Sequence, residues 1–428
     1  MDMDIQSETV TRIYAAWVKE GSAEPPRRYL GASVAGHECD RFLWLHFRGL
    51  FRERFDGRMY RLFDRGRREE AVFCKELRSI GCEVWEVNPE TGSQFEVTAL
   101  GGHFGGHLDA VAMGIPEAPK TPHVCEFKTH SDASWRKLAK AGVKDAKPMH
   151  FAQMQIYMGM MALERALYLA VNKDTDELYA ERVRFDRDFF KAAQIRIRRI
   201  IEGADAERCA TRRDDWRCKA CPARAVCWHE TGTVFSRVLG WHDCRSCCHA
   251  SPETDGAMPT RKWSCRLGHT CTIGRDCQCA DHLILPALID ADGVEGATER
   301  SVTYRIGGNL VTNGAANGQF TSDELAHVGR DPLEHGSVQR VKELCEGARV
   351  VNQLTIPALM DGLPEDFIMM KGPMAEVKNE LAIKDWQITA RESDGDVQYF
   401  AFDAMGRKVY MSYDAKKDLA VVKGETVF

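Results

Sequence analysis

Three charged residues near the middle of the chain have the types and spacing that phosphodiester hydrolysis needs. Asp109 ends a short run after two glycines, while Glu126 and Lys128 lie two positions apart in the apolar run 124–129. Because side chains alternate along a strand, Glu126 and Lys128 share one face. Burying a carboxylate and an ammonium costs several kcal/mol unless they pair or bind metal. An ion pair at a strand edge is the alternative for Glu126 and Lys128 alone.

Asp109 favours the metal-binding interpretation, because a hairpin connection would place it beside Glu126. Hydrolysis of a phosphodiester uses a divalent cation to neutralise the phosphate and activate a water. Mg²⁺ prefers carboxylate oxygens and keeps several waters. We therefore expect Asp109 and Glu126 to bind Mg²⁺ or Mn²⁺, with the Phe127 carbonyl as a third candidate ligand. Lys128 would orient the attacking water or stabilise the developing charge.

Three further polar residues are candidates for the same site. Glu70 lies on an Arg-rich helical segment and would add a carboxylate or a water contact. Gln153 and Tyr157 are four residues apart, which places them on one face of a helix. They would hold a phosphate or the lysine, and a packed polar face is the equally good structural alternative.

Cysteines form a second pattern, since 11 of the 16 lie between Cys209 and Cys279. In a reducing compartment such clustering indicates metal binding more often than disulfides. Cys218, Cys221 and Cys227 form one group, and Cys39 stands far upstream as a candidate fourth ligand. Four thiolates suit both zinc and an iron–sulfur cluster. Either metal would connect the start of a domain to its end.

The other cysteines and histidines resemble a zinc ribbon. Cys244 and Cys247 form the first pair, and the ligands we expect with them are Cys265 and Cys279, with His282 competing for the last place. Candidates outnumber the ligands of one Zn²⁺ ion, so some are bystanders or a second site exists. Such a module would bind DNA or a partner protein rather than catalyse a reaction.

The elements that must position these residues follow a recognisable order. Hydrophobic periodicity predicts helices over 5–20, 41–49, 61–80, 149–163 and 188–203. Predicted strands cover 82–87, 94–100, 104–113, 124–129, 165–171 and 178–185. This order predicts an α/β sandwich with a mixed central sheet. Beyond about residue 300 the pattern is that of a small α+β domain, with a hairpin formed by 397–403 and 408–413.

Length and charge suggest three parts. A chain of 428 residues exceeds one usual domain, and we divide it into 1–235, 236–290 and 291–428. Residues 287–428 carry 15 Lys and Arg against 23 Asp and Glu, whereas the preceding residues carry a net charge of +3. A basic first part with an acidic tail fits a DNA-binding enzyme with a separate module. The sequence contains no membrane-span pattern and no apolar signal segment, so we expect a cytoplasmic protein.

The order of these motifs resembles the PD-(D/E)XK nuclease superfamily, and within it the RecB-type exonucleases of phages and of CRISPR adaptation. Gly106-His-Leu-Asp109 resembles the strand with the metal-binding Asp, and Glu126-Phe-Lys128 matches the (D/E)XK element. Gln153-Met-Gln-Ile-Tyr157 matches the QxxxY element. Gly66-Arg-Arg-Glu-Glu70 resembles the family's helix motif, although some relatives carry His in that helix. The resemblance covers about residues 30–230.

This resemblance implies a restriction-endonuclease-like core and a metal-dependent DNA exonuclease acting in phage or prophage recombination or DNA-end processing. It also implies a [4Fe–4S] cluster at Cys39, Cys218, Cys221 and Cys227. DNA would be the main partner, together with a recombination or integration protein. The alternatives are a nuclease that trims CRISPR spacers and a non-catalytic DNA-binding scaffold. The sequence has no G-x4-G-K-[ST] phosphate loop, so no ATP motor is expected.

Overall fold

The computed structural model describes most of the chain. The described residues are 7–23, 27–236, 243–256, 259–270, 279–344, 349–350, 368–372, 387–393, 396–402, 408–414 and 419–423. They form two compact units, one made of residues 1–224 with 251–268 and the other of residues 225–250 with 269–428. This grouping cuts across the module that we predict at 236–290. A hairpin of that module lies in the first unit, and its other described residues lie in the second.

A mixed five-stranded sheet forms the centre of the first unit, as the sequence predicts. Its order is β2 (Glu83–Trp85), β5 (Ala110–Met113), β6 (His123–His130), β7 (Arg165–Asn172) and β8 (Leu178–Arg184). Strands β6 and β7 run parallel, and the other neighbouring pairs run antiparallel. A parallel pair needs a crossover, which here consists of α4 (Asp132–Ala146) and α5 (Pro148–Met161). The predicted helix 149–163 corresponds to α5, whereas α4 has no counterpart among the predicted helices.

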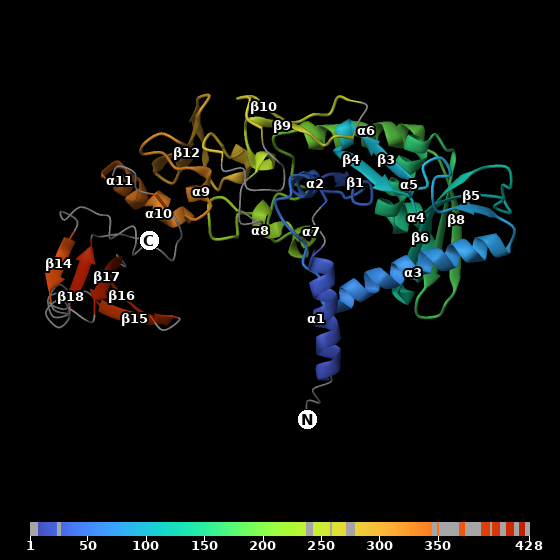
Figure 1. Ribbon diagram of the computed structural model, residues 1–428, viewed down its shortest axis with the longest axis horizontal. Coiled ribbons are helices and arrows are strands. Elements are labelled where there is room, and N and C mark those ends of the chain that lie inside the picture. Colours follow the sequence, from blue (N-terminus) through green and yellow to red (C-terminus); the bar gives the residue numbers. More distant parts are fainter. Residues whose placement is uncertain are drawn as a thin grey trace. The chain divides into compact units, whose positions relative to one another are not determined.

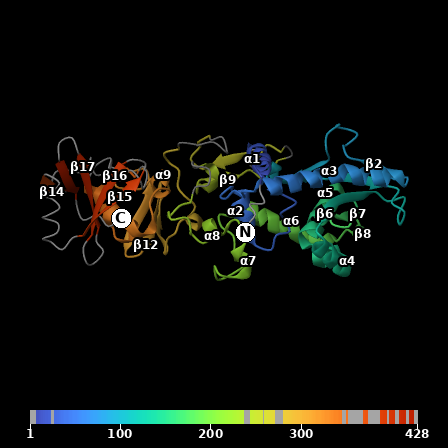
Figure 2. The ribbon, with the colours of Figure 1, turned by 90° about the horizontal axis from the view of Figure 1, so that it is seen from below.

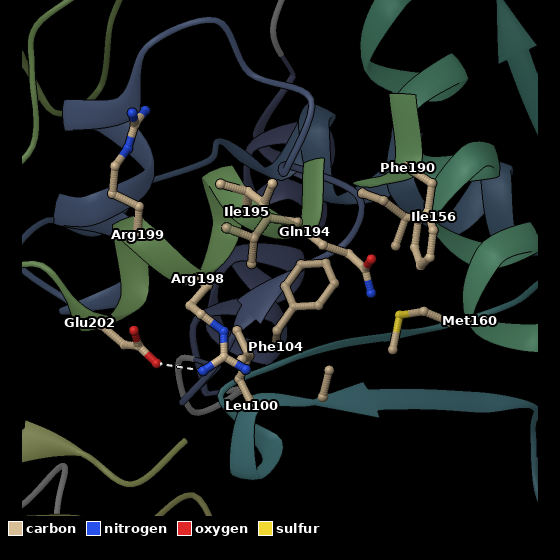
Figure 3. Close-up of a pocket in the computed structure, with 12 residues that line it drawn as sticks. Leu100, Phe104, Ile156, Met160, Phe190, Gln194, Ile195, Arg198, Arg199 and Glu202 are labelled. Carbon is tan, nitrogen blue, oxygen red and sulfur yellow. Dashed lines mark hydrogen bonds and ion pairs between the residues drawn. The ribbon is translucent and has the colours of Figure 1, made fainter. Parts of the chain in front are cut away.

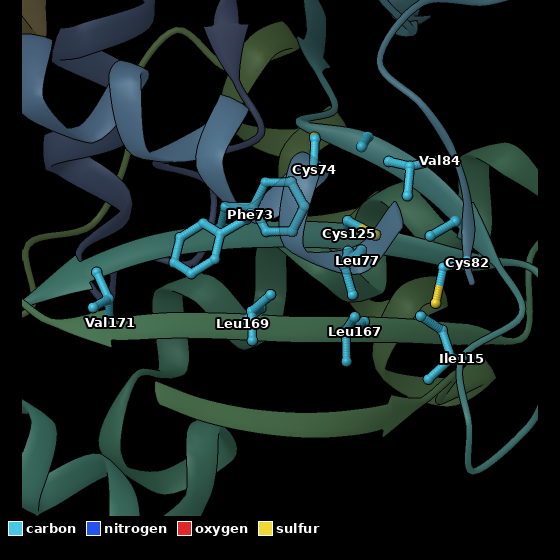
Figure 4. Close-up of a cluster of buried hydrophobic side chains, with 13 residues drawn as sticks. Phe73, Cys74, Leu77, Cys82, Val84, Ile115, Cys125, Leu167, Leu169 and Val171 are labelled. Carbon is cyan, nitrogen blue, oxygen red and sulfur yellow. The ribbon is translucent and has the colours of Figure 1, made fainter. Parts of the chain in front are cut away.

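Helix α3 (Gly57–Ser79) covers one face of this sheet. Its first turn is capped by Asp56, whose carboxylate accepts the Met59 N–H at 2.7 Å. Phe73 and Leu77 of α3 pack onto Phe127 and its neighbours in an apolar cluster (Figure 4). Figure 2 shows α3 and α4 on opposite sides of β6, β7 and β8. The sheet is therefore covered on both faces, as a buried sheet with a parallel pair requires.

The predicted strand 104–113 is wrong in one respect, because the structure breaks it into two strands of different sheets. Strand β4 (Phe104–His107) pairs with β1 (Leu30–Gly31) and β3 (Glu96–Ala99), whereas β5 belongs to the central sheet. The fully buried Leu108 lies at the break, and its N–H donates to the Phe95 carbonyl at 3.0 Å. Asp109 thus lies between two sheets, at the edge where β5 begins.

The remaining helices of the first unit match the predicted ones closely. They are α1 (Glu8–Ala23), α2 (Asp40–Phe47) and α6 (Arg187–Glu202). The short α7 (Trp216–Lys219) has no counterpart among the predicted helices, and all four are labelled in Figure 1. Helix α6 joins α2 through Arg196, whose guanidinium contacts Asp40 at 2.7 Å and the His37 carbonyl at 2.6 Å. No helix within the described ranges is both long and apolar enough to cross a membrane.

A two-stranded hairpin, β9 (Ala250–Pro252) and β10 (Trp263–Cys265), contributes an aromatic anchor to the first unit. The Trp263 ring stacks on Phe47 with centroids 5.7 Å apart, and the Arg48 guanidinium lies over it at 5.5 Å. The Lys262 carbonyl and His103 Nε2 are 2.8 Å apart. Packing of the half-buried Trp263 ring in this way explains why 251–268 belongs to the first unit.

The second unit combines two sheets with short helices. They are α8 (Arg224–Cys227), β11 (Gly293–Ala297), β12 (Ser301–Ile306), β13 (Asn309–Gly314), α9 (Ser322–Leu325), α10 (Arg330–Glu334) and α11 (Ser337–Leu344). A second antiparallel sheet has the order β14 (Ile368–Gly372), β18 (Leu419–Lys423), β17 (Lys408–Asp414), β16 (Asp396–Phe402) and β15 (Gln387–Ser393). Pairing of β16 with β17 confirms the predicted hairpin.

Candidate active site

Asp109 is held at the start of β5 by the neighbouring strand. The pairing of Ala110 with Cys125 places Asp109 next to Glu126. One Asp109 oxygen, Oδ2, accepts the Phe127 N–H at 2.7 Å. The carboxylate is mostly buried, with 15% of its side chain exposed. The structure therefore places Asp109 beside Glu126, as the sequence predicts.

Glu126 and Lys128 share one face of β6 and form an ion pair. The Lys128 ammonium contacts Glu126 Oε1, donates to the Phe127 carbonyl at 2.9 Å and lies 3.9 Å from Asp109 Oδ2. The Glu126 side chain is completely buried. Apart from the ion pair, neither Glu126 oxygen has a hydrogen-bond partner among the described residues. A buried carboxylate without hydrogen bonds is unstable unless a cation compensates it.

Burial and charge perturb the ionisation of this group. Burial raises the pKa of Glu126 to about 7, although Lys128 opposes the shift. Burial alone would lower the pKa of Lys128, but the carboxylates of Glu126 and Asp109 outweigh burial and raise it above its ordinary value. Perturbed groups of this kind cluster at functional sites.

Glu70 on α3 is the third carboxylate near this group. Burial and the charge of Asp109 raise the pKa of Glu70 to about 7, and the Lys128 ammonium opposes the shift. The charges of Asp109 and Lys128 therefore act on the Glu70 carboxylate, which the sequence predicts as an additional site residue. A divalent cation near these oxygens would favour their ionised forms.

Gln153 and Tyr157 support the strand that leads to Asp109. The Tyr157 hydroxyl donates to the His107 carbonyl at 2.8 Å, and Gln153 Nε2 donates to the same hydroxyl at 3.4 Å. A Cβ at Gly106 would lie 2.6 Å from the Tyr157 oxygen, so only glycine permits this approach. Tyr157 thus contacts the backbone of the strand, and Gln153 contacts Tyr157. The predicted contact of Gln153 and Tyr157 with a phosphate or the lysine remains a prediction.

The donor set suits a hard divalent cation. Within the described ranges, no group of three or more His, Cys, Asp and Glu side chains is arranged to hold a metal ion by itself. The protein would thus supply the oxygens of Asp109 and Glu126, and water or phosphate oxygens would complete the shell, as Mg²⁺ prefers. The Glu126 oxygens without hydrogen-bond partners are the observation that fits this role.

Three members of the first cysteine set, Cys39, Cys218 and Cys221, lie in the first unit, and their binding of a metal remains a prediction. Cys39 precedes α2 in the segment that Arg196 fixes, and its sulfur accepts the Cys209 N–H at 3.4 Å. Burial, with a hydrogen bond to Cys39, raises the pKa of Cys209 to about 12, and Cys218 acts in the same direction. Sequence reasoning did not include Cys209, which lacks C-x2-C spacing. Cys227 belongs to the second unit.

The second cysteine set is divided between the units. Cys244, Cys247, Cys279 and His282 lie in the second unit, whereas Cys265 lies in the first. His282 is buried; its Nδ1 is 2.8 Å from Ser322 Oγ and its Nε2 is 3.2 Å from Ser246 Oγ. Its ring therefore contacts serine hydroxyls of the second unit. The zinc ligands predicted here remain predictions.

An apolar cavity of about 570 Å³ lies elsewhere in the first unit, between α5, α6 and the β3–β4 region (Figure 3). Phe104, Ile156 and Phe190 line it, and the ion pair of Arg198 with Glu202 stands at one end. None of the predicted catalytic residues is in its lining. The candidate catalytic residues therefore lie around the start of β5 and not in this cavity.

The sequence matches the model of a known family over residues 11–228, described as the PD-(D/E)XK nuclease superfamily. The match covers half of the chain, and the chain belongs to this superfamily. Nucleases of this superfamily typically use divalent metals such as Mg²⁺ or Mn²⁺.

Solved structures matched to this chain include an alkaline exonuclease, LHK-Exo, from Laribacter hongkongensis, at 13% identity and a TM-score of 0.29. That similarity covers 44% of this chain and 90% of the other. A structure described as SSO0001 has 16% identity and a TM-score of 0.30, over 52% of this chain and 97% of that one. No curated protein matches the chain.

Proposed function

We propose that the protein is a Mg²⁺- or Mn²⁺-dependent DNA exonuclease. The observation that carries this proposal is the buried Glu126 carboxylate beside Asp109, whose oxygens have no hydrogen-bond partner among the described residues apart from the ion pair with Lys128. A fold that used these residues only for stability would have no reason to bury such a carboxylate, since apolar residues of similar volume are often as stable. Membership of the nuclease superfamily supports the same function.

Each residue has a role that its surroundings support. Asp109 and Glu126 would hold the cation, which when bound supplies charge neutralisation and an activated water. Lys128 stays protonated because two carboxylates surround it, so it would stabilise negative charge on the phosphate. Glu70 would accept a hydrogen bond from a water at the site. Tyr157 and Gln153 would keep the Asp109 strand in place through the His107 carbonyl.

Exonuclease action on DNA ends, in recombination or end processing, is the finer part of this proposal. It rests on the resemblance of the QxxxY element to the RecB type. End-labelled linear DNA and covalently closed circular DNA, each with EDTA, Mg²⁺ or Mn²⁺, provide the test. We expect cation-dependent release of nucleotides from linear DNA and none from the circle.

Controls separate this function from its rivals. Asp109→Asn keeps the shape of the side chain and should abolish cleavage, while Asp145→Asn on α4 should not. Cleavage of the closed circle would contradict the exonuclease assignment. Binding without cleavage at any cation concentration would favour the non-catalytic scaffold. Cleavage only with a bound integrase would favour the spacer-trimming nuclease.

We also propose that Cys39, Cys218, Cys221 and Cys227 hold a [4Fe–4S] cluster. The arrangement of one early and three late cysteines supports it, as does the burial of Cys39 and Cys218. Such a cluster binds only the folded chain and would stabilise it.

The protein purified without oxygen should be brown, with broad visible absorbance and about four iron atoms per chain. Cys39→Ser should lose this absorbance, while Cys74→Ser, at a buried cysteine of α3, should retain it. Colourless protein with stoichiometric zinc would contradict the cluster.

A zinc site drawn from Cys244, Cys247, Cys265, Cys279 and His282 is a separate proposal. It rests on the ribbon-like spacing of these residues. Deleting the whole segment would also remove Trp263 from the first unit, so a point variant is the sharper test. Cys247→Ser should lower the zinc content by about one ion per chain relative to Cys82→Ser. Equal zinc content in the two variants would contradict the proposal.

A further inference from the structure

Three ring side chains joined by hydrogen bonds on and beside β6 and β7 have no part in the site described above. They are His130 at the end of β6, Tyr168 on β7 and His150 in the first turn of α5. Tyr168 pairs with Glu126 across the two strands, so its side chain is on the Glu126 face. The fully buried Tyr168 hydroxyl lies 2.8 Å from His130 Nε2 and 2.9 Å from His150 Nδ1. One hydroxyl thus joins two imidazoles.

The connection continues from His130 to a lysine. His130 Nδ1 lies 3.3 Å from the Ser134 hydroxyl on α4. The Lys147 ammonium donates to the same hydroxyl at 2.5 Å. Lys147 immediately precedes α5, so the chain of hydrogen bonds begins and ends near the start of that helix.

A direction can be assigned to the hydrogen bonds in this chain from the donor that cannot accept. An ammonium only donates, so Ser134 Oγ accepts from Lys147. The structure gives the Ser134 proton a single acceptor among the described residues, which is His130 Nδ1. The unprotonated state of His130 Nδ1 is also favoured, because its lone pair faces the positive charge of Lys147.

In this assignment His130 carries its proton on Nε2 and donates it to the Tyr168 oxygen. Tyr168 in turn donates its hydroxyl proton to His150 Nδ1. The remaining proton of His150 is therefore on Nε2. That atom has no hydrogen-bond partner among the described residues, and the side chain is half-buried.

Both imidazoles are neutral near pH 7. Burial, followed by the charges of Lys147 and Lys128, lowers the pKa of His130 to about 4. Burial and the charge of Lys128 lower the pKa of His150 to about 3. A neutral imidazole can donate a hydrogen bond beside Lys128 and a divalent cation, where a charged imidazolium would be repelled.

We propose that His150 is a further catalytic residue whose Nε2–H donates a hydrogen bond to the phosphodiester under hydrolysis. His150 shares its helix face with Gln153 and Tyr157, which support the Asp109 strand. The Lys128 ammonium is near enough to perturb it. The other four members of the chain are positioning residues, because they set its tautomer. This inference rests on the proposed nuclease function.

Steady-state cleavage of linear DNA by the full chain tests the role. Wild type must cut and Glu126→Gln must fail, which establishes the proposed function independently. His150→Phe keeps the ring but has no donor, and kcat should fall about 100-fold with KM within threefold. His150→Gln keeps an N–H group near the Nε2 position and should lose less than tenfold. If His150→Phe cuts at the wild-type rate while Glu126→Gln fails, the role of His150 is contradicted and the nuclease function stands.

Tyr168→Phe tests the chain that orients His150. The variant keeps the ring and removes the shared hydroxyl, so kcat should fall about tenfold. Tyr179→Phe, on the neighbouring strand, is the matched control and should cut normally. An unchanged kcat in Tyr168→Phe would contradict the positioning role.

The tautomer can be observed directly by ¹⁵N NMR of histidine-labelled protein. The signal of His150, assigned by its loss in His150→Gln, should be that of a neutral ring protonated on Nε2. A ring protonated on Nδ1 or a charged ring at pH 7 would overturn the proposal, since Nε2 would then not be the donor described here.

Discussion

The two faces of β6 have opposite characters, although they alternate along the same eight residues. On one face, Cys125 and Phe127 pack beneath Phe73 of α3 in an apolar cluster. On the other, the buried Glu126 forms an ion pair with the half-buried Lys128 that leaves Glu126 short of hydrogen bonds. The first face stabilises the fold by removing apolar surface from water. The second costs stability through desolvation.

From this contrast we expect the apolar face of β6 to determine the stability of the fold and the charged face to determine the rate of cleavage. Substitutions on the apolar face should lower the free energy of unfolding and leave the cleavage rate of the folded protein nearly unchanged. Substitutions on the charged face should do the reverse. A one-residue shift in the register of β6 would exchange the faces, so the Phe73–Phe127 contact also determines which way Glu126 points.

Lys128→Met is the change with the largest expected effect. It removes the cation that compensates Glu126 and the charge that would stabilise the phosphate. We expect kcat/KM for linear DNA to fall about 10³-fold. The exposed Lys140→Met on α4 is the control and should cut at the wild-type rate. Similar cleavage rates for Lys128→Met and Lys140→Met would show that the charged face takes no part in catalysis.

Phe73→Ala tests the apolar face. Truncation of this fully buried ring should lower the free energy of unfolding of the first unit by about 3–5 kcal/mol. Val72→Ala, at a side chain 42% exposed on the same helix, should change it by less than about 0.5 kcal/mol. Urea titration gives both values. A loss of cleavage in folded Phe73→Ala protein, well below its midpoint, would contradict the separation of the faces.

Gly106→Ala tests how the charged face is positioned. The added methyl would lie 2.6 Å from the Tyr157 oxygen, so Tyr157 or the β4 strand must move. We expect a loss of about 1–3 kcal/mol in unfolding free energy and a lower cleavage rate. The Gly106→Ala, Tyr157→Phe double variant should recover part of both, because the clashing oxygen is gone. No recovery would show that this contact does not position Asp109.

The pH dependence of stability is the smallest effect that distinguishes the faces. The pKa of Glu126 is about 7 in the folded protein and about 4.5 when unfolded, so the folded state binds the proton more tightly. Stability should therefore fall as pH rises from about 4.5 through 7 in metal-free protein. Relative to wild type, Glu126→Gln should gain stability between pH 5 and pH 8 in urea titrations. If the stability gained by Glu126→Gln does not depend on pH, Glu126 does not have the raised pKa described here.

Much of the first unit could be predicted from its sequence because its strands and helices carry clear periodicity. Glu126 and Lys128 alternate with apolar residues, so the shared face follows from strand geometry alone. The break between β4 and β5 could not be predicted in this way. Residues 104–113 are all compatible with one strand, and the choice of two sheets depends on partners distant in the sequence.

The hydrogen-bond chain from Lys147 to His150 also could not be predicted from the sequence. His130 has the right alternation to join the charged face, but its partner Tyr168 lies on a different strand and His150 on a helix. Likewise, nothing in the spacing of the cysteines indicates that Trp263 anchors their hairpin to Phe47. Such contacts follow from tertiary packing rather than from local pattern.

The rate of Mg²⁺-dependent nucleotide release from linear DNA by Glu126→Gln, compared with wild type at pH 8, tests the central claim most directly. The substitution keeps the shape of the side chain and removes only the charge that would hold the cation. We predict a rate at least about 10³-fold lower, with a thermal midpoint no lower than that of the metal-free wild type. Wild-type cleavage by well-folded Glu126→Gln would contradict the account.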